Sequence, residues 1–516
     1  MSGWGPHRQG RHPAMWSQEQ DVGFPGEAPA DPAVFYDSPR ARIFHRLLGL
    51  TFLTAFLSLG VQIRTLIGPF GLLPVSDLMS NLHHRGVPWW EVPTYFWIAS
   101  DTGMIDYGIA LGVILSLLST LGVAPRFMLI FLIPLYLSFT VACTTFLSFQ
   151  WDALLLETGV LALFLRREKP TRWVHFLFLA LLFKLYFESG IAKWESHLGD
   201  WQDGSAMTFY YETAPLPTWL GYYAHHLPTW WHQLESRLVL VLELVVPFLI
   251  FGPRRARLVA FFALAGFQIL NILTANYGFF SYLSLFLHAF LLDEADWHRL
   301  RLLARRIYRR PAFVAVEPAE GVGSLDGLVG VGVVGAWLFL SAVGGWQQFS
   351  GAPLDLGPKV GKAVEVASTF RLVNTYHLFS QITRERNEPE IQSWDGREWR
   401  AHPFKYKPGP VDRRPPFVAP HQPRVDFRLW FYGLSYERGT PTFVTTLLER
   451  ACQVPRSLDG LLAEPLPAEP VAVRVVLWRY HFTSEEERAE TGAWWRRDPL
   501  EGGAQKSCGR RPKVTR

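Results

Sequence analysis

Long apolar stretches separated by short polar loops dominate the first two-thirds of the chain. An α-helix needs about 20 residues to cross the hydrocarbon core of a bilayer, and most of these stretches reach that length. Two of them, 151–165 and 278–292, are short and are also compatible with re-entrant segments. The pattern predicts a polytopic α-helical membrane domain over residues 40–345 with about eight or nine spans. We expect these spans at 44–67, 104–122, 126–149, 151–165, 173–192, 236–252, 256–275, 278–292 and 325–344.

The pattern changes to a period of two from about residue 351, which is typical of β-strands. An Asp395-Gly396 pair lies between two alternating segments and predicts a β-hairpin. Residues 425–434 and 471–482 are expected to be further strands. The chain therefore predicts a mostly-β domain at 351–485. On either side of the folded parts we expect a flexible tail at 1–39 and a disordered basic tail at 486–516.

The distribution of Lys and Arg orients the membrane domain, because these residues collect in short cytoplasmic loops. Alternate loops at 68–103, 193–235 and 276–278 are nearly free of basic residues. The pattern alternates throughout only if both short stretches cross the membrane. We therefore expect a cytoplasmic N-terminus and an exoplasmic C-terminal domain. The basic loops lie at 40–46, 126, 166–172, 254–257 and 299–310.

Composition supports a membrane protein and narrows its partners. The 516 residues are 49% hydrophobic and only 18% charged, against about 25% charged in an average soluble protein. A net charge of +5 without a basic stripe does not favour a nucleic-acid partner. The three cysteines have no metal-ligand spacing, so no metal site is expected. Cys143 lies in an apolar run, whereas Cys452 and Cys508 either pair in an oxidising compartment or, as we expect, remain separate thiols.

Ionisable residues inside predicted spans are candidates for function, because burying a charge in a bilayer is costly. Lys184 and Glu188 are four residues apart, so they share a helix face and can neutralise each other. Glu157 has no such neighbour and needs either a partner on another helix or a functional role. Lys193, at the end of a span, either snorkels to the interface or acts as a base of lowered pKa. Glu243 belongs to the same group.

Motifs in both halves resemble the lipase maturation factor family. In the membrane half they are the run Phe149–Gly159, the Ser189-Gly190 pair with Lys193, and the Tyr211-Glu212-Thr213 segment. Within the first run, the motif residues are Gln150, Trp151, Asp152 and Glu157. In the C-terminal half they are Val373–Phe379, Phe404–Gly409 and Ala419–Asp426. Ala214 and His377 stand where the family pattern has Gln and Gly.

The resemblance implies a multi-pass protein of the endoplasmic reticulum membrane that helps homodimeric lipases fold and assemble, with its C-terminal domain in the lumen. The excess of Arg over Lys suggests a GC-rich, bacterial genome; in a bacterium the site would be the cytoplasmic membrane. The expected partners are a secreted, lipase-like client and the lipid bilayer, with no cofactor. The residues expected to contact the client are Trp394, Trp399, His421, Gln422, Arg424, Asp426 and Trp430, although such aromatic residues also suit the domain's own core.

A weaker resemblance covers one helix and the loop after it. Tyr186-Phe187 through Ser189-Gly190 to Lys193, followed by Asp200-Trp201 and Gly204, is similar to the membrane core of vitamin K-dependent γ-carboxylases. That similarity implies an alternative function, a membrane carboxylase or oxidoreductase in which Lys193 is a base, Glu157 assists and a quinone-like cofactor binds. A transporter is less favoured, because the few intramembrane polar residues do not outline a path.

Overall fold

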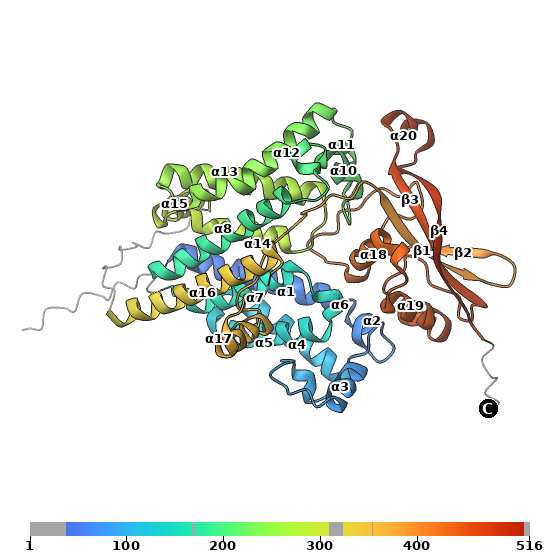
Figure 1. The fold of residues 1–516 in the computed structure, drawn as a ribbon, viewed down its shortest axis with the longest axis horizontal. Coiled ribbons are helices and arrows are strands. Elements are labelled where there is room, and N and C mark those ends of the chain that lie inside the picture. Colours follow the sequence, from blue (N-terminus) through green and yellow to red (C-terminus); the bar gives the residue numbers. More distant parts are fainter. Residues whose placement is uncertain (1–37, 168–170, 309–323, 353, 510–516) are drawn as a thin grey trace, which may run out of the picture.

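The computed structural model describes residues 38–167, 171–308, 324–352 and 354–509. It confirms the predicted fold class, a helical membrane bundle followed by a small antiparallel sheet (Figure 1). The described chain contains six helices long and apolar enough to cross a membrane. These are α1 (Pro39–Gly60), α4 (Thr102–Leu121), α5 (Pro125–Ala142), α8 (Arg172–Trp194), α13 (Arg254–Thr274) and α16 (Ser324–Ser350).

The other three predicted spans are also helical but shorter. They form α7 (Gln150–Phe164), α12 (Thr229–Leu244) with the 3₁₀ turn Val246–Phe251, and α14 (Phe280–Leu287) with the 3₁₀ turn His288–Leu291. At 15 residues α7 is about 22 Å long, shorter than the roughly 30 Å hydrocarbon core. The number of full crossings therefore stays a prediction.

Short helices form the loops at the two ends of the bundle. The basic loops meet at one end, where Arg254 of α13 pairs with Asp296 of α15 (Glu294–Tyr308) and Arg40 of α1 pairs with Glu294. The opposite end carries the longer, basic-poor loops. They contain α2 (Ile63–Ile67), α3 (Val75–His84), α6 (Thr144–Leu147), α9 (Asp200–Asp203), α10 (Ala206–Thr213) and α11 (Trp219–His225).

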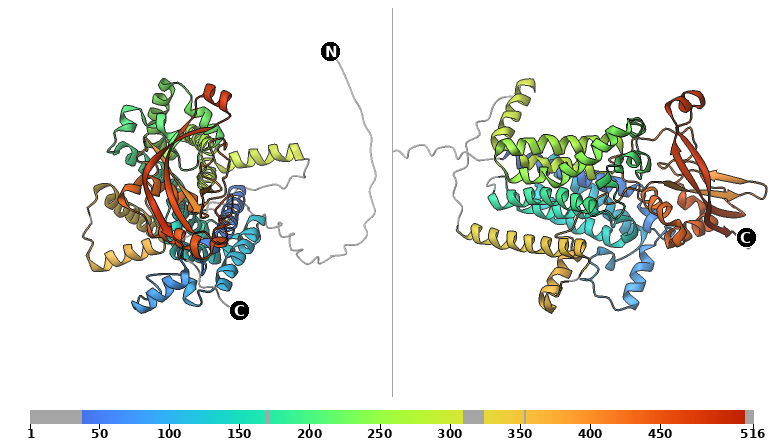
Figure 2. Two further views of the ribbon diagram at one scale, coloured as in Figure 1. Left: turned by 90° about the vertical axis from the view of Figure 1, so that its right-hand side faces the viewer. Right: turned by 45° about the horizontal axis from the view of Figure 1, so that its top comes forward.

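The C-terminal region packs against that basic-poor end (Figures 1 and 2). After α17 (Gly357–Thr369), four strands form an antiparallel sheet in the order β2-β1-β3-β4. The expected hairpin is confirmed, with Trp394 paired to Trp399 across its turn, and β3 confirms the strand expected at 471–482. The strands are β1 (Arg386–Trp394), β2 (Trp399–His402), β3 (Ala472–Phe482) and β4 (Trp495–Ser507).

Two predictions for this region are wrong. Residues 425–434 are not a strand but lie in α18 (Arg424–Ser435), which contributes Val425, Leu429 and Tyr432 to the core on one helical face. Residues 486–507 are not a disordered tail, because α20 (Glu485–Thr491) and β4 occupy this stretch, and β4 pairs with β3. The folded region therefore continues past residue 485. Most of the expected N-terminal tail, and residues 510–516, lie outside the described residues.

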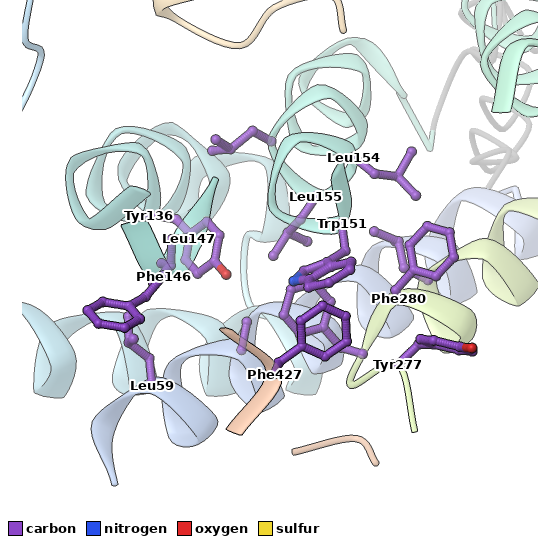
Figure 3. Close-up of a cluster of buried hydrophobic side chains, with 14 of the residues drawn as sticks. Leu59, Tyr136, Phe146, Leu147, Trp151, Leu154, Leu155, Tyr277, Phe280 and Phe427 are labelled. Carbon is purple, nitrogen blue, oxygen red and sulfur yellow. The ribbon is translucent and has the colours of Figure 1, made fainter. Parts of the chain in front are cut away.

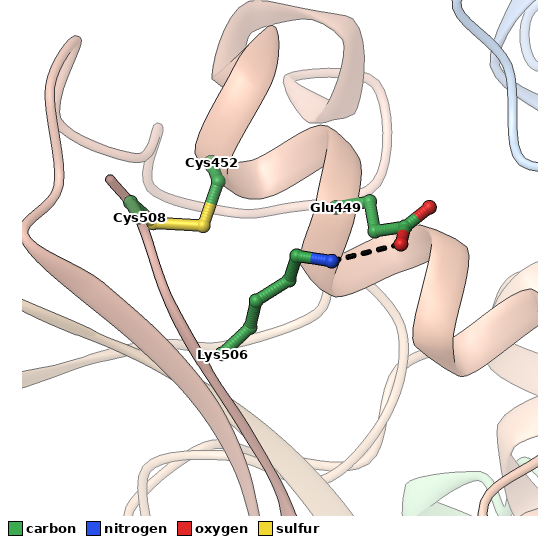
Figure 4. Close-up of a disulfide and its surroundings, with 4 residues drawn as sticks. All are labelled: Glu449, Cys452, Lys506 and Cys508. Carbon is green, nitrogen blue, oxygen red and sulfur yellow. Dashed lines mark hydrogen bonds and ion pairs between the residues drawn. A yellow bond between two sulfur atoms is a disulfide. The ribbon is translucent and has the colours of Figure 1, made fainter. Parts of the chain in front are cut away.

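Cys452 and Cys508 form a disulfide, contrary to the expectation of two separate thiols. The bond joins α19 (Thr442–Gln453) to the end of β4, and beside it Lys506 forms an ion pair of 2.8 Å with Glu449 (Figure 4). Cys143 is a buried free thiol, as expected. The two links fasten the last strand to the helix that supports the sheet.

Candidate functional site: the junction of bundle and sheet

Motif residues of the two halves meet in a buried junction between the bundle and the C-terminal region. Its apolar part contains Phe427 of α18, whose ring lies 4.9 Å from that of Trp151 on α7 (Figure 3). Tyr277 and Phe280 belong to the same cluster of buried side chains (Figure 3). The C-terminal region and the membrane bundle therefore share one hydrophobic core.

A bidentate ion pair lies at the centre of the junction. The two terminal nitrogens of Arg424 donate to the two carboxylate oxygens of Asp152 at 2.7 and 2.8 Å, and the Tyr136 hydroxyl donates to the same carboxylate at 2.6 Å. Asp152 and Arg424 are 1% exposed each. A fork-to-fork pair fixes geometry as well as charge. It therefore sets the position of α18 on the first turn of α7.

Two intramembrane carboxylates hold the segment 371–382, which links α17 to the sheet. Glu157 accepts hydrogen bonds from the Tyr376 hydroxyl at 2.8 Å, from the Asn374 backbone at 3.0 Å and from the Trp337 indole at 3.0 Å. Glu188 accepts from the Tyr376 backbone at 2.8 Å. The expected partner of Glu157 on another helix is thus Trp337 of α16, and the linker supplies the rest.

Lys193 has a carboxylate partner of its own. Its ammonium lies 2.7 Å from Glu243 on α12 and donates to the Leu378 carbonyl at 2.8 Å. Both side chains of the pair are about 95% buried. Gly190 explains how the two helices approach so closely, because a Cβ at this position would lie 2.9 Å from the Glu243 backbone. Lys193 therefore neither snorkels nor stands free as a base in this conformation.

Glu212 and Gln150 also connect the halves. Glu212 accepts from the Phe482 backbone at 2.8 Å and from His481 at 3.0 Å, at the end of β3. Gln150 accepts from the backbone of His377 at 3.0 Å. This bond uses the backbone, so it does not depend on the residue type at position 377.

A further buried charge cluster, not predicted from the sequence, begins on β1. Arg386 and Lys407 each lie 2.6 Å from Glu388, and Arg386 donates to the carbonyls of Glu212 and Pro215. Burial raises the pKa of the neighbouring Asp426 to about 6 and lowers the pKa of Lys407. The sequence offered one signal for this cluster, because Lys407 lies in the Phe404–Gly409 motif. Its partners Arg386 and Glu388 lie about 20 positions earlier in the chain.

The structure divides the proposed client contacts into two groups. Gln422, Arg424 and Asp426 are at most 2% exposed, His421 bonds to Ser58 of α1, and Trp430 donates to the Thr213 carbonyl at 2.9 Å. These residues lie in the junction, where Gln422, Arg424 and Asp426 are closed to a large partner and His421 and Trp430 are partly exposed. Trp394 and Trp399 are also partly exposed, but on the hairpin at the far end of the sheet.

The alternative catalytic residues do not share partners. Glu157 bonds to Trp337, Asn374 and Tyr376, whereas Lys193 bonds to Glu243 and Leu378. Within the described ranges, no group of three or more His, Cys, Asp or Glu side chains is arranged to hold a metal ion. The geometry assigns both residues to the junction.

These features define a polytopic membrane protein whose C-terminal sheet region is joined to its bundle by buried polar pairs. The family model of the lipase maturation factor transmembrane domain matches residues 39–299, and that of the lipase maturation factor C-terminal domain matches residues 372–503. The chain belongs to the lipase maturation factor family, which confirms the resemblance seen in its motifs.

Curated relatives agree with this assignment. The chain is 31% identical to lipase maturation factor 2 of Gallus gallus, over 88% of this chain and 79% of the relative. It is 30% identical to lipase maturation factor 2 of Homo sapiens, over 89% and 81%, and 29% identical to human lipase maturation factor 1, over 87% and 84%. No solved structure matches the chain.

Proposed function

We propose that this protein is a maturation factor that helps secreted lipases fold and assemble, and that its C-terminal sheet works on the exoplasmic side of the membrane. Family membership supports the role, and the names of the relatives supply lipases as the client class. In a eukaryote the membrane would be that of the endoplasmic reticulum, and in a bacterium the cytoplasmic membrane.

The disulfide is the main observation that supports an exoplasmic position for the sheet region. Disulfides persist in oxidising compartments and are rare in the cytosol, and the Cys452–Cys508 bond lies within the sheet region. That region packs against the basic-poor end of the bundle, opposite the cluster of Arg254, Arg257 and Asp296. Both features agree with a cytoplasmic basic end and an exoplasmic sheet.

The hairpin is the part of the sheet best placed to contact a client. The rings of Trp394 and Trp399 lie 5.5 Å apart, and the guanidinium of Arg474 lies 4.0 Å from the centre of the Trp399 ring. Exposed Trp and Arg side chains are enriched in the energetically dominant part of protein interfaces. We place the client on this hairpin rather than on the buried Ala419–Asp426 motif.

The test uses a cell line that secretes a homodimeric lipase and has lost its own maturation factor. Expression of the full chain should restore the secreted lipase activity per amount of lipase protein. The W394A/W399A variant should restore several-fold less, at an equal level in the membrane. A matched control, W89A/W90A, changes an exposed Trp pair in another loop and should behave as wild type. Failure of the wild-type chain to restore activity would contradict the proposed role, whereas an active hairpin variant would contradict only the proposed contact.

A further inference from the structure

A polar cavity of about 390 Å³ opens beside the junction. Its volume is in the range of small-molecule sites, about 300–1,000 Å³. The start of α7, the ends of α5 and α16, α17 and the linker segment 373–377 form its walls. The lining includes the apolar residues Leu147, Leu156 and Leu340, here called the apolar wall, together with the polar residues Gln347, Gln348 and Arg371. The lining therefore combines polar and apolar side chains, which suits a ligand with a polar headgroup and apolar chains, such as a membrane lipid.

The cavity lies where the bundle meets water on the sheet side. Gln347 and Gln348 belong to the last turns of α16, and Thr140 to the last turn of α5. The following helix, α17, carries Val360, Val364 and Ala367 at the i, i+4, i+7 spacing of one apolar face. An amphipathic helix directly after a span suits the headgroup region of a bilayer. The opening of the cavity is thus at the depth of lipid headgroups.

Three features of the cavity favour an anion. Arg371 lines it, and no carboxylate of the described chain lies within ion-pair distance of its guanidinium. The N-terminus of α7 faces it through Ser148, Phe149 and Gln150, and free backbone N–H groups at a helix start attract negative charge. The Asp152 carboxylate does not oppose this, because Arg424 neutralises it.

Two further observations at the lining agree with a ligand site. Nδ1 of His377 is buried and has no hydrogen-bond partner among the described residues, whereas buried polar atoms are normally satisfied. Arg371 adopts a φ of +53°, which non-glycine residues rarely do. Strained backbone of this kind concentrates at binding and catalytic sites.

We propose that this cavity binds the phosphate-bearing headgroup of a membrane phospholipid, with Arg371 as the main ligand of the phosphate and the apolar wall against the glycerol and upper acyl chains. Basic pockets between membrane helices are known to accept lipid headgroups. The proposal concerns a site apart from the client-contacting hairpin and is independent of the proposed function.

The test is native mass spectrometry of the full-length protein in mild detergent. The probes are phosphatidylglycerol, diacylglycerol with the same acyl chains, and inorganic phosphate. Wild type should retain one phosphatidylglycerol molecule, should not retain diacylglycerol, and should not lose the lipid when inorganic phosphate is added. Retention of both lipids would overturn a phosphate site, and displacement by inorganic phosphate would overturn a lipid site.

Variants test which residues of the cavity hold the lipid. Arg371→Asn removes the guanidinium while keeping a residue that tolerates positive φ, and it should weaken retention at least about tenfold. Arg371→Lys keeps the charge and should retain more lipid than Arg371→Asn. Arg400→Asn, on the exposed hairpin, is the matched control and should match wild type. Because Leu340→Phe narrows the apolar wall without touching the charge, it should also reduce retention. Unchanged retention in both Arg371→Asn and Leu340→Phe would overturn the assignment.

Discussion

Some of the buried charges at the junction form pairs, and at the residue scale this pairing determines how a single substitution must be interpreted. Lys193 and Glu243 neutralise each other inside the bundle. Removing one member of a buried pair leaves an uncompensated charge, which typically costs about 3–5 kcal/mol, whereas replacing both by apolar residues is often neutral. A loss of function in a single Lys193 variant is therefore no evidence for catalysis.

The Lys193–Glu243 pair predicts that a second substitution can rescue the effect of the first. Lys193→Met should lower the thermal midpoint of the detergent-solubilised protein and reduce recovery of active lipase. Lys193→Met combined with Glu243→Leu should restore both towards wild type, because no charge is left unpaired. A double variant that is as stable as wild type, but yields no active lipase, would contradict a purely structural role and would support the carboxylase-like alternative.

Two groups in the Ala419–Asp426 motif predict opposite effects of pH on stability. Burial lowers the pKa of His421 to about 4, from about 6.5 when unfolded. The unfolded state then binds more protons, so this contribution to stability is full above pH 6.5 and is lost as the pH falls towards 4. For Asp426, whose pKa burial raises to about 6, stability is greatest below pH 3.8 and is lost as the pH rises through 6.

The measurement is the difference between the thermal midpoints at pH 7 and pH 5. His421→Gln should make the midpoint at pH 7 minus that at pH 5 smaller than in wild type, because the loss on acidification is removed. Asp426→Asn should make the same difference larger. Shifts of the same sign in both variants would contradict the assignment of these two groups.

The sequence singled out most residues of the junction but not their partners. Asp152, Glu157 and Lys193 were recognisable as charges within or beside apolar runs. Their contacts come from far along the chain; Asp152 and Arg424, for example, are 272 positions apart. No local pattern encodes such a pairing. The Ala419–Asp426 motif was therefore interpreted as a client surface, although the fold places most of it in the interior.

At the scale of elements, periodicity predicted the helices of the bundle and β1–β3, but it missed the helices of the C-terminal region, among them α17 and α19, and two further failures there are instructive. Residues 425–434 place apolar side chains both at every second position and at helical spacing, and short runs of this kind are ambiguous. The fold resolves the ambiguity, because Gly433 lets α18 approach β1 closely; a Cβ there would lie 1.9 Å from the Asn387 carbonyl. β4 was missed because it is an edge strand rich in charges and glycine, as edge strands often are.

The link between α19 and β4 predicts a stability effect. The disulfide closes a loop with a sequence separation of 56 residues, for which the chain-entropy estimate is about 4 kcal/mol of stabilisation. The C452S/C508S variant should therefore unfold its sheet region at lower temperature, with lower recovery of active lipase. Cys143→Ala, which removes the free thiol but keeps the disulfide, should unfold at the wild-type temperature and should be destabilised by reductant as the wild type is. An unchanged midpoint on reduction of the wild type would show that the bond contributes little.

At the scale of the whole molecule, the two halves share one buried core and a set of buried hydrogen bonds. Gln62 of the bundle donates to the Gln422 carbonyl and accepts from the Arg424 backbone, and Asn276 accepts from the backbone of Val418 and Ala419. A C-terminal fragment expressed alone would expose these polar groups and the apolar face around Phe427. Client experiments therefore require the full chain.

The last prediction concerns the side of the membrane that each end of the molecule faces. Single introduced cysteines can measure it. Arg397 lies at the exposed tip of the hairpin, and Arg255 is exposed at the basic end of the bundle. The native cysteines give little background, because two are disulfide-bonded and Cys143 is buried. In sealed vesicles, a membrane-impermeant maleimide should label Arg397→Cys only from the exoplasmic side and Arg255→Cys only from the cytoplasmic side. Labelling of both from one side would mean that the chain between them crosses an even number of times, which would contradict the nine-span topology. Labelling of Arg397→Cys from the cytoplasm alone would place the sheet in a reducing compartment, where neither the disulfide nor a secreted client is expected.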